Sequence, residues 1–190
     1  MRVEPSKPRY TIERSGSGLV VTAPPRRNWL ILPFLVVWLG GWTIGGFSAF
    51  EAVLEPGSHR AFMVFWLIGW AFGELYALFI ILWQLMGREQ LTISSKGLVH
   101  RVLVGGLNRA REFAAADIRH LRASPQVLSP WMDQRSWMPP VFGAGHGAIA
   151  FDYGAKTYRI ASGLDEAEAR LVLAEIAKYM PKMVETDSEL

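Results

Sequence analysis

The residue with the clearest chemical signature is Glu74, a carboxylate inside an otherwise apolar run. A charge at the centre of a membrane helix costs about 2.5 kcal/mol or more unless it is neutralised or paired. We weigh three uses: a hydrogen bond from Trp38 that locks two helices, a docking point for a polar group on a partner's membrane helix, or a step in a proton path. Two helices cannot enclose a path alone, so the third use is least favoured.

No other residues form a recognisable reactive set. Residues 143–147 (GAGHG) resemble a phosphate-binding loop, but a strand is expected to follow them, whereas such loops precede a helix. The four histidines are scattered and cysteine is absent, which argues against a metal site and excludes thiol chemistry. No Ser, His and Asp form a nucleophile motif. We therefore predict no catalytic residue, no metal, no cofactor and no enzyme.

The elements around Glu74 are two hydrophobic segments, predicted as helices over residues 29–50 and 61–86. The first contains 22 residues without an ionisable side chain, which would span about 33 Å and cross a bilayer. The second is longer and is interrupted by Glu74 and Gln84. The linker over residues 51–60 suits a tight return, so residues 29–86 are predicted to form a transmembrane hairpin.

The distribution of basic residues predicts the orientation of this hairpin. The first 28 residues carry six Lys or Arg, whereas the linker carries only Arg60. Since cytoplasmic flanks are enriched in basic residues, both termini should face the cytoplasm.

Each predicted helix contains a Gly-x-x-x-Gly spacing, Gly41 with Gly45 and Gly69 with Gly73. Such spacings let two helix backbones approach closely. We predict a glycine-lined contact within the hairpin, with a dimer seam as the main alternative.

Aromatic residues also occupy the apolar region itself. They exceed what one contact between two helices can use, so they face lipid or form a surface for other membrane subunits, a pigment or a quinone. With Glu74, the candidate partner-binding residues are Trp38, Trp42, Trp66 and Trp70.

The residues outside the transmembrane hairpin are predicted to form one mainly β domain. An N-terminal hairpin within residues 1–28 is expected to join the later sheet, because an isolated hairpin is barely stable. After the helices, alternating segments predict antiparallel strands, and a later apolar stripe predicts a helix with Ser162 as its N-cap and Pro181 at its end. We thus assign residues 87–181 to the domain and 182–190 to a tail. The predicted strands cover residues 10–14, 19–22, 91–94, 98–104, 108–113, 118–121, 148–153 and 156–160.

Four stretches sharpen this interpretation: residues 87–93 (GREQLTI), 113–118 (FAAADI), 147–153 (GAIAFDY) and 163–169 (GLDEAEA). Following a membrane hairpin, they resemble bacterial membrane-anchored pleckstrin-homology-like proteins. The resemblance implies an antiparallel meander or partly open barrel of about seven strands, capped by a C-terminal helix, at the bacterial inner membrane. It implies an interaction role rather than a reaction.

Two soluble surfaces are candidate binding sites. Basic side chains could hold lipid headgroups, although a solvated sheet face beside an anionic membrane explains them as well; they are Arg26, Arg27, Arg88, Arg109 and Arg111. The segment 124–146 is rich in proline and large apolar residues, which suggests partner binding, insertion into the membrane interface, or a cover for the sheet. Its candidate residues are Trp131, Met132, Trp137, Met138 and Phe142.

Together these features favour an accessory or assembly subunit that binds another membrane protein. A lipid-headgroup or envelope-stress sensor is the first alternative, and a minor proton-coupled transport component is the second. The expected partners are membrane lipid and a larger membrane complex, and a homo-oligomer is compatible with the sequence. Nucleic acid is not expected, because basic residues do not cluster with exposed aromatics.

Overall fold

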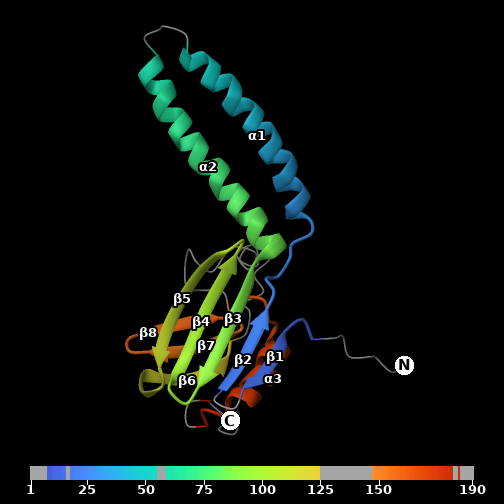
Figure 1. Ribbon diagram of the computed structural model, residues 1–190, viewed down its shortest axis with the longest axis vertical. Coiled ribbons are helices and arrows are strands. Elements are labelled where there is room, and N and C mark those ends of the chain that lie inside the picture. The colour runs from blue at the N-terminus through green and yellow to red at the C-terminus, as the bar shows by residue number, and fades with distance from the viewer. Residues whose placement is uncertain (1–7, 16–17, 55–58, 125–146, 182–183, 185–190) are drawn as a thin grey trace, which may run out of the picture. The chain divides into compact units, whose positions relative to one another are not determined.

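The computed structural model describes residues 8–15, 18–54, 59–124, 147–181 and 184. The chain divides into two compact units (Figure 1). The helical unit is Arg27–Leu85, and the β unit combines Met1–Arg26 with Met86–Leu190. The β unit is therefore built from two chain segments that flank the helices.

The helical unit consists of α1 (Ile31–Leu54) and α2 (Arg60–Met86). Asn28 begins α1, because its side-chain oxygen accepts from the N–H groups of Leu30 and Ile31 at 3.1 and 3.2 Å. Gln84 accepts from the Asn28 N–H at 3.0 Å, so the start of α1 is bonded to the end of α2.

Both helices are long and apolar enough to cross a membrane, and most of their surface is not covered by the protein. A core helix of a soluble protein would instead be buried. The sequence prediction of two long apolar helices is confirmed, although α1 extends to Leu54 rather than to residue 50.

The larger sheet of the β unit has five antiparallel strands in the order β1-β2-β3-β4-β5. β2 pairs with β3 from Gly18↔Ser94 to Ala23↔Glu89, so strands from both sides of the helices form one sheet. Gly105 and Gly106 make the β4–β5 turn with positive φ angles of 51° and 94°. The strands are β1 (Thr11–Ser15), β2 (Gly18–Ala23), β3 (Arg88–Ser94), β4 (Gly97–Val104) and β5 (Leu107–Ala114).

A short 3₁₀ turn, η1 (Ala115–Asp117), leads from β5 into a three-stranded antiparallel sheet in the order β6-β7-β8. The pairing of β6 with β7 shifts register between Arg119 and Arg122, and His120 adopts a φ of 50° in this bulge. The strands are β6 (Ile118–Ala123), β7 (Ile149–Tyr153) and β8 (Lys156–Ile160).

Helix α3 (Glu166–Ile176) packs against β6 and buries an apolar face that includes Val172 and Ile176. Its N-cap is Asp165, which forms a capping box with Glu168, so the prediction of Ser162 as the N-cap was wrong. The side chain of Ser162 instead bonds to Glu89.

The core of the β unit lies between the two sheets and α3 and is mainly aliphatic. Phe113 links the sheets, because its ring meets those of Phe151 and Tyr158 edge-on at centroid distances of 4.9 and 5.0 Å. An ion pair also joins β1 to α3, between Arg14 and Glu175 at 2.9 Å. The described residues thus form a mainly antiparallel sheet protein with a C-terminal helix, as the sequence predicted.

Candidate functional site

The centre of the helical unit is a reciprocal pair of tryptophans. The indole N–H of Trp42 donates to the backbone carbonyl of Trp70 at 3.2 Å, and that of Trp70 donates to the carbonyl of Trp42 at 3.0 Å. The two rings stack with centroids 4.0 Å apart. Two half-buried indoles therefore satisfy their donors inside the hairpin.

Glycines make room for these rings. A β-carbon on Gly46 would lie 3.0 Å from the Trp70 indole nitrogen, and one on Gly45 would lie 3.0 Å from the same ring. Gly73 provides the matching space for Trp42 at 3.3 Å. The predicted glycine contact thus exists at Gly45 and Gly73, but each glycine faces an indole rather than the backbone of the other helix.

The other predicted packing glycines do not take part. A β-carbon added to Gly41 or to Gly69 would meet open space. Apart from the adjoining backbone of its own helix, no atom of the described residues would lie within 4 Å of it. The sequence did not predict a packing role for Gly46. The sequence signal for that role is its position next to Gly45.

Glu74 is bonded within the hairpin, but not to the predicted residue. The hydroxyl of Thr43 donates to Glu74 Oε1 at 2.6 Å. Trp38 instead lies against Trp42, with ring centroids 4.4 Å apart. The expected Trp38–Glu74 hydrogen bond is replaced by one from a smaller residue that the sequence did not single out.

The predicted aromatic residues form one continuous row across both helices. Trp38 contacts Trp42, Trp42 stacks on Trp70, and Trp66 follows Trp70 at 6.2 Å. Phe62 extends the row beyond Trp66 at 6.3 Å. Trp66 and Phe62 are 50% and 61% exposed, so this end of the row offers ring surface to a neighbouring molecule.

The β unit contains a buried polar cluster that the sequence did not predict. Glu89, only 2% exposed, accepts hydrogen bonds from the backbone N–H of Ser162 at 3.1 Å and from the Ser162 hydroxyl. His100 Nε2 lies 3.5 Å from the same carboxylate. Burial raises the pKa of Glu89, but His100 and the Ser162 donors outweigh this effect, so the pKa falls below its usual value.

This cluster is not arranged for nucleophilic catalysis. The carboxylate lies between Ser162 and His100, so the hydroxyl donates to an acid and not to an imidazole that could remove its proton. Ala161, directly before Ser162, holds a φ of 63° that is unfavourable for a residue with a β-carbon. Glu89 and His100 occupy inward positions of β3 and β4, where the other inward residues are buried and apolar. A polar residue at an inward position of an alternating strand was the sequence signal that could have identified both residues.

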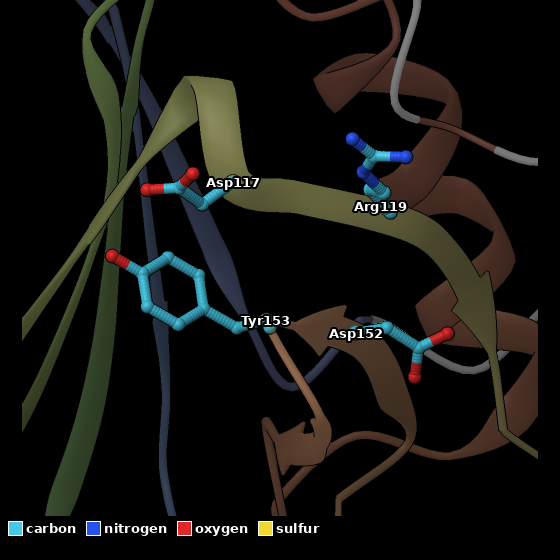
Figure 2. A pocket seen from close by; sticks show the side chains of 5 residues that line it. Asp117, Arg119, Asp152 and Tyr153 are labelled. Carbon is cyan, nitrogen blue, oxygen red and sulfur yellow. The ribbon is translucent and has the colours of Figure 1, made fainter.

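A shallow open cleft of about 390 Å³ lies beside η1 and the β7–β8 turn (Figure 2). Asp152 on its wall accepts from Thr157 at 2.6 Å and from Arg122 at 3.4 Å, and these contacts, the Thr157 bond above all, lower its pKa. Figure 2 shows Asp117 and Tyr153 on one side of this cleft and Arg119 and Asp152 on the other. The side chains therefore do not converge on one ligand position.

The predicted basic residues do not form one patch on the β unit. Arg109 lies opposite the inward-facing Val102, whereas Arg88 lies opposite Leu103 on the other face of the sheet. Arg111 shares the face of Arg109. Arg26 belongs to the β unit, while Arg27 belongs to the helical unit, where it donates to the Leu85 carbonyl at 3.3 Å and lies 5.9 Å from the Trp29 ring centroid.

The predicted apolar loop residues all fall outside the described part of the chain: Trp131, Met132, Trp137, Met138 and Phe142. Among the residues that the structure does describe, no three His, Cys, Asp or Glu side chains are grouped to hold a metal ion. No protein-family model matches the sequence, and a search of curated proteins also finds no match.

Proposed function

We propose that this chain is a non-enzymatic accessory or assembly subunit of a larger membrane protein complex. In this proposal α1 and α2 cross a bacterial inner membrane as a hairpin, both termini face the cytoplasm, and the β unit is a pleckstrin-homology-like interaction domain. The six basic residues before the first helix support this orientation.

One observation carries the proposal: the two central tryptophans of the hairpin satisfy each other's indole donors, and the hairpin still presents a large aromatic surface. Trp42 and Trp70 bond to each other, so the remaining rings are not needed to hold the two helices together. Trp66, Phe65 and Phe72 are 50%, 74% and 70% exposed. Aromatic residues are enriched where proteins bind partners, which favours a neighbouring subunit as their contact.

The membrane orientation can be tested directly because the chain has no cysteine. Single cysteines at His59 and Lys156, both exposed, would report on the helix connection and the β unit. A membrane-impermeant maleimide should label H59C in intact spheroplasts and K156C only after lysis. Labelling of K156C in intact spheroplasts would contradict the cytoplasmic placement.

The accessory role is tested by purifying tagged full-length protein from its native membrane in mild detergent and weighing the intact complex by native mass spectrometry. We expect one partner at a fixed ratio, and we expect Trp66→Ala combined with Phe65→Ala to release it. Phe34→Ala serves as the matched control, because it removes a ring that is 62% exposed from the other helix, α1. A monomer or homodimer in every preparation would overturn the proposal.

The sensor alternative has one specific observation in its favour, the placement of Arg109 and Arg111 on one exposed face of β5. It predicts that anionic lipid in nanodiscs stabilises the full chain at low salt and less at high salt. The stabilisation should be absent from the variant with Arg109→Gln and Arg111→Gln. Equal melting temperatures in anionic and neutral nanodiscs would remove this alternative.

A further inference from the structure

Glu74 is an incompletely satisfied acceptor in the apolar part of the hairpin. It is half-buried in α2, the longer of the two helices that could cross a membrane. A carboxylate has two oxygens with about four acceptor positions. In the described part of the helical unit, the hydrogen bond to Glu74 comes from Thr43.

That single donor is itself shared. The Thr43 hydroxyl lies 2.9 Å from the backbone carbonyl of Leu39 and 2.6 Å from Glu74 Oε1. A hydroxyl has one hydrogen and cannot donate fully to two acceptors. Thr43 therefore satisfies at most one acceptor position of Glu74, and the Leu39 carbonyl competes for that bond.

The nearest strong donors are committed elsewhere. The indoles of Trp42 and Trp70, each within one turn of Thr43 or Glu74 along its helix, donate to each other's backbone carbonyls. Ala71, one turn before Glu74, is exposed and has a small side chain, so another helix can approach closely beside the carboxylate.

We propose that Glu74 is the docking point for a partner's membrane helix that carries a lysine or arginine at the same depth. This inference rests on the proposed function and adds the chemistry of the partner. Charge complementarity selects the cation, because an unpaired carboxylate in a hydrocarbon medium is costly and an opposite charge offsets that cost. Trp66 and Phe62, the exposed end of the aromatic row, precede Glu74 on α2 by eight and twelve residues, a spacing in steps of four that keeps them along one ridge of the helix, and they would supply the apolar part of the same contact.

A set of synthetic membrane peptides can stand in for the partner helix and test this proposal. Full-length protein, labelled with a donor dye and reconstituted in vesicles, is titrated with acceptor-labelled poly-leucine transmembrane peptides that carry one central Lys, Asn or Leu. We expect the Lys peptide to associate about tenfold more tightly than the Leu peptide, and Glu74→Leu to abolish the difference. Glu51→Gln, which neutralises the other acid of α1 and α2, is the matched control and should retain it.

Thr43→Val separates docking from a purely structural role. If Glu74 serves docking, loss of the Thr43 donor should keep or increase the preference for the Lys peptide. If Glu74 only locks the helices, the preference should be absent in wild type and Thr43→Val alike. Near-UV circular dichroism of the stacked tryptophans checks in each variant that the hairpin is intact.

The outcomes distinguish this inference from the proposed function. Equal binding of the Lys and Leu peptides to intact hairpins would overturn the inference, while a stoichiometric native complex would still support the accessory role. Energy transfer between two labelled copies that Glu74→Leu abolishes would also overturn it, in favour of a second copy at this site. If the Lys peptide is preferred but no native partner is found, the proposed function is contradicted. The result would then support only the statement that Glu74 binds a cation on another membrane helix.

Discussion

Ser162 donates both its backbone N–H and its hydroxyl to the carboxylate of Glu89, although the two residues are 73 positions apart in the chain. Glu89 is the second residue of β3, the first strand after the helices, and Ser162 follows the last strand, β8. This bond therefore joins the strand that follows α2 to the segment that leads into α3. It also makes the stability of the protein depend on pH.

Glu89→Gln should weaken this dependence. Because the folded pKa of Glu89 is lowered, its ionised form stabilises the fold above the unfolded pKa of about 4.3, and this contribution is lost as pH falls through the folded value. At pH 7 the substitution should lower the free energy of unfolding by about 1–3 kcal/mol. Urea unfolding in detergent at several pH values between neutral and acid measures both effects. Glu112→Gln, at an exposed position of β5, is the control, and equal pH slopes for Glu89→Gln and wild type would contradict the assignment.

Ala161→Gly should cost less stability than the same substitution at another buried alanine. The φ of 63° costs a residue with a β-carbon about 1–2 kcal/mol, and glycine removes this cost. Glycine also adds about 0.5–1 kcal/mol of unfolded-state entropy and removes a buried methyl group worth about 0.8 kcal/mol, so the free energy of unfolding should change little. Ala148→Gly, at a buried alanine whose φ is not positive, should destabilise by about 1–2 kcal/mol, and the same loss at both positions would rule out strain at Ala161.

Asp165→Ala should shorten or loosen α3. The substitution removes the bond that Asp165 accepts from the Glu168 N–H at 2.8 Å, and loss of an N-cap costs about 1 kcal/mol. Thermal unfolding followed by circular dichroism measures the change. Asp117→Ala removes an exposed acid of η1 and should have a smaller effect; if the two variants melt alike, Asp165 does not cap the helix.

Trp42→Phe and Trp70→Phe should each weaken the hairpin, because each keeps a ring and removes an indole donor. A hydrogen bond between membrane helices contributes about 0.6 kcal/mol on average. Unfolding in mixed micelles should therefore show a loss of about this size for each substitution, because each leaves the other tryptophan's backbone carbonyl without its donor. Trp66→Phe controls for ring size at a half-exposed position, and equal losses at Trp42, Trp70 and Trp66 would contradict the reciprocal bond.

Gly46→Ala should disturb the same pair. The new methyl group would lie 3.0 Å from the Trp70 indole nitrogen, and that ring is held in place by its stacking and its hydrogen bond. Gly41→Ala adds the same methyl group where nothing lies within 4 Å, so it should be neutral. Near-UV circular dichroism of the stacked tryptophans should change for the first variant alone. A matching change in both would mean that the effect belongs to the helix backbone.

The sequence by itself determined the element types. Two long apolar runs, of which the second contains one acid, can satisfy their backbone in an apolar medium as helices, and alternating apolar residues in β3, β4 and β7 specify strands with one buried face. These are local properties, because they depend on side chains two to four positions apart. The same local pattern identified Glu74 and the tryptophans as unusual residues in their surroundings.

Only the tertiary structure decided which partners these residues have. Thr43 rather than Trp38 meets Glu74, and indoles rather than backbones fill the space at Gly45 and Gly73, because the rotation of each helix about its axis selects the contacts. Glu89, His100 and Ser162 come together because β3 and β4 pair in one register and the chain returns after β8. Helix rotation and strand register are set by packing across the whole unit, so spacing along the chain did not reveal them.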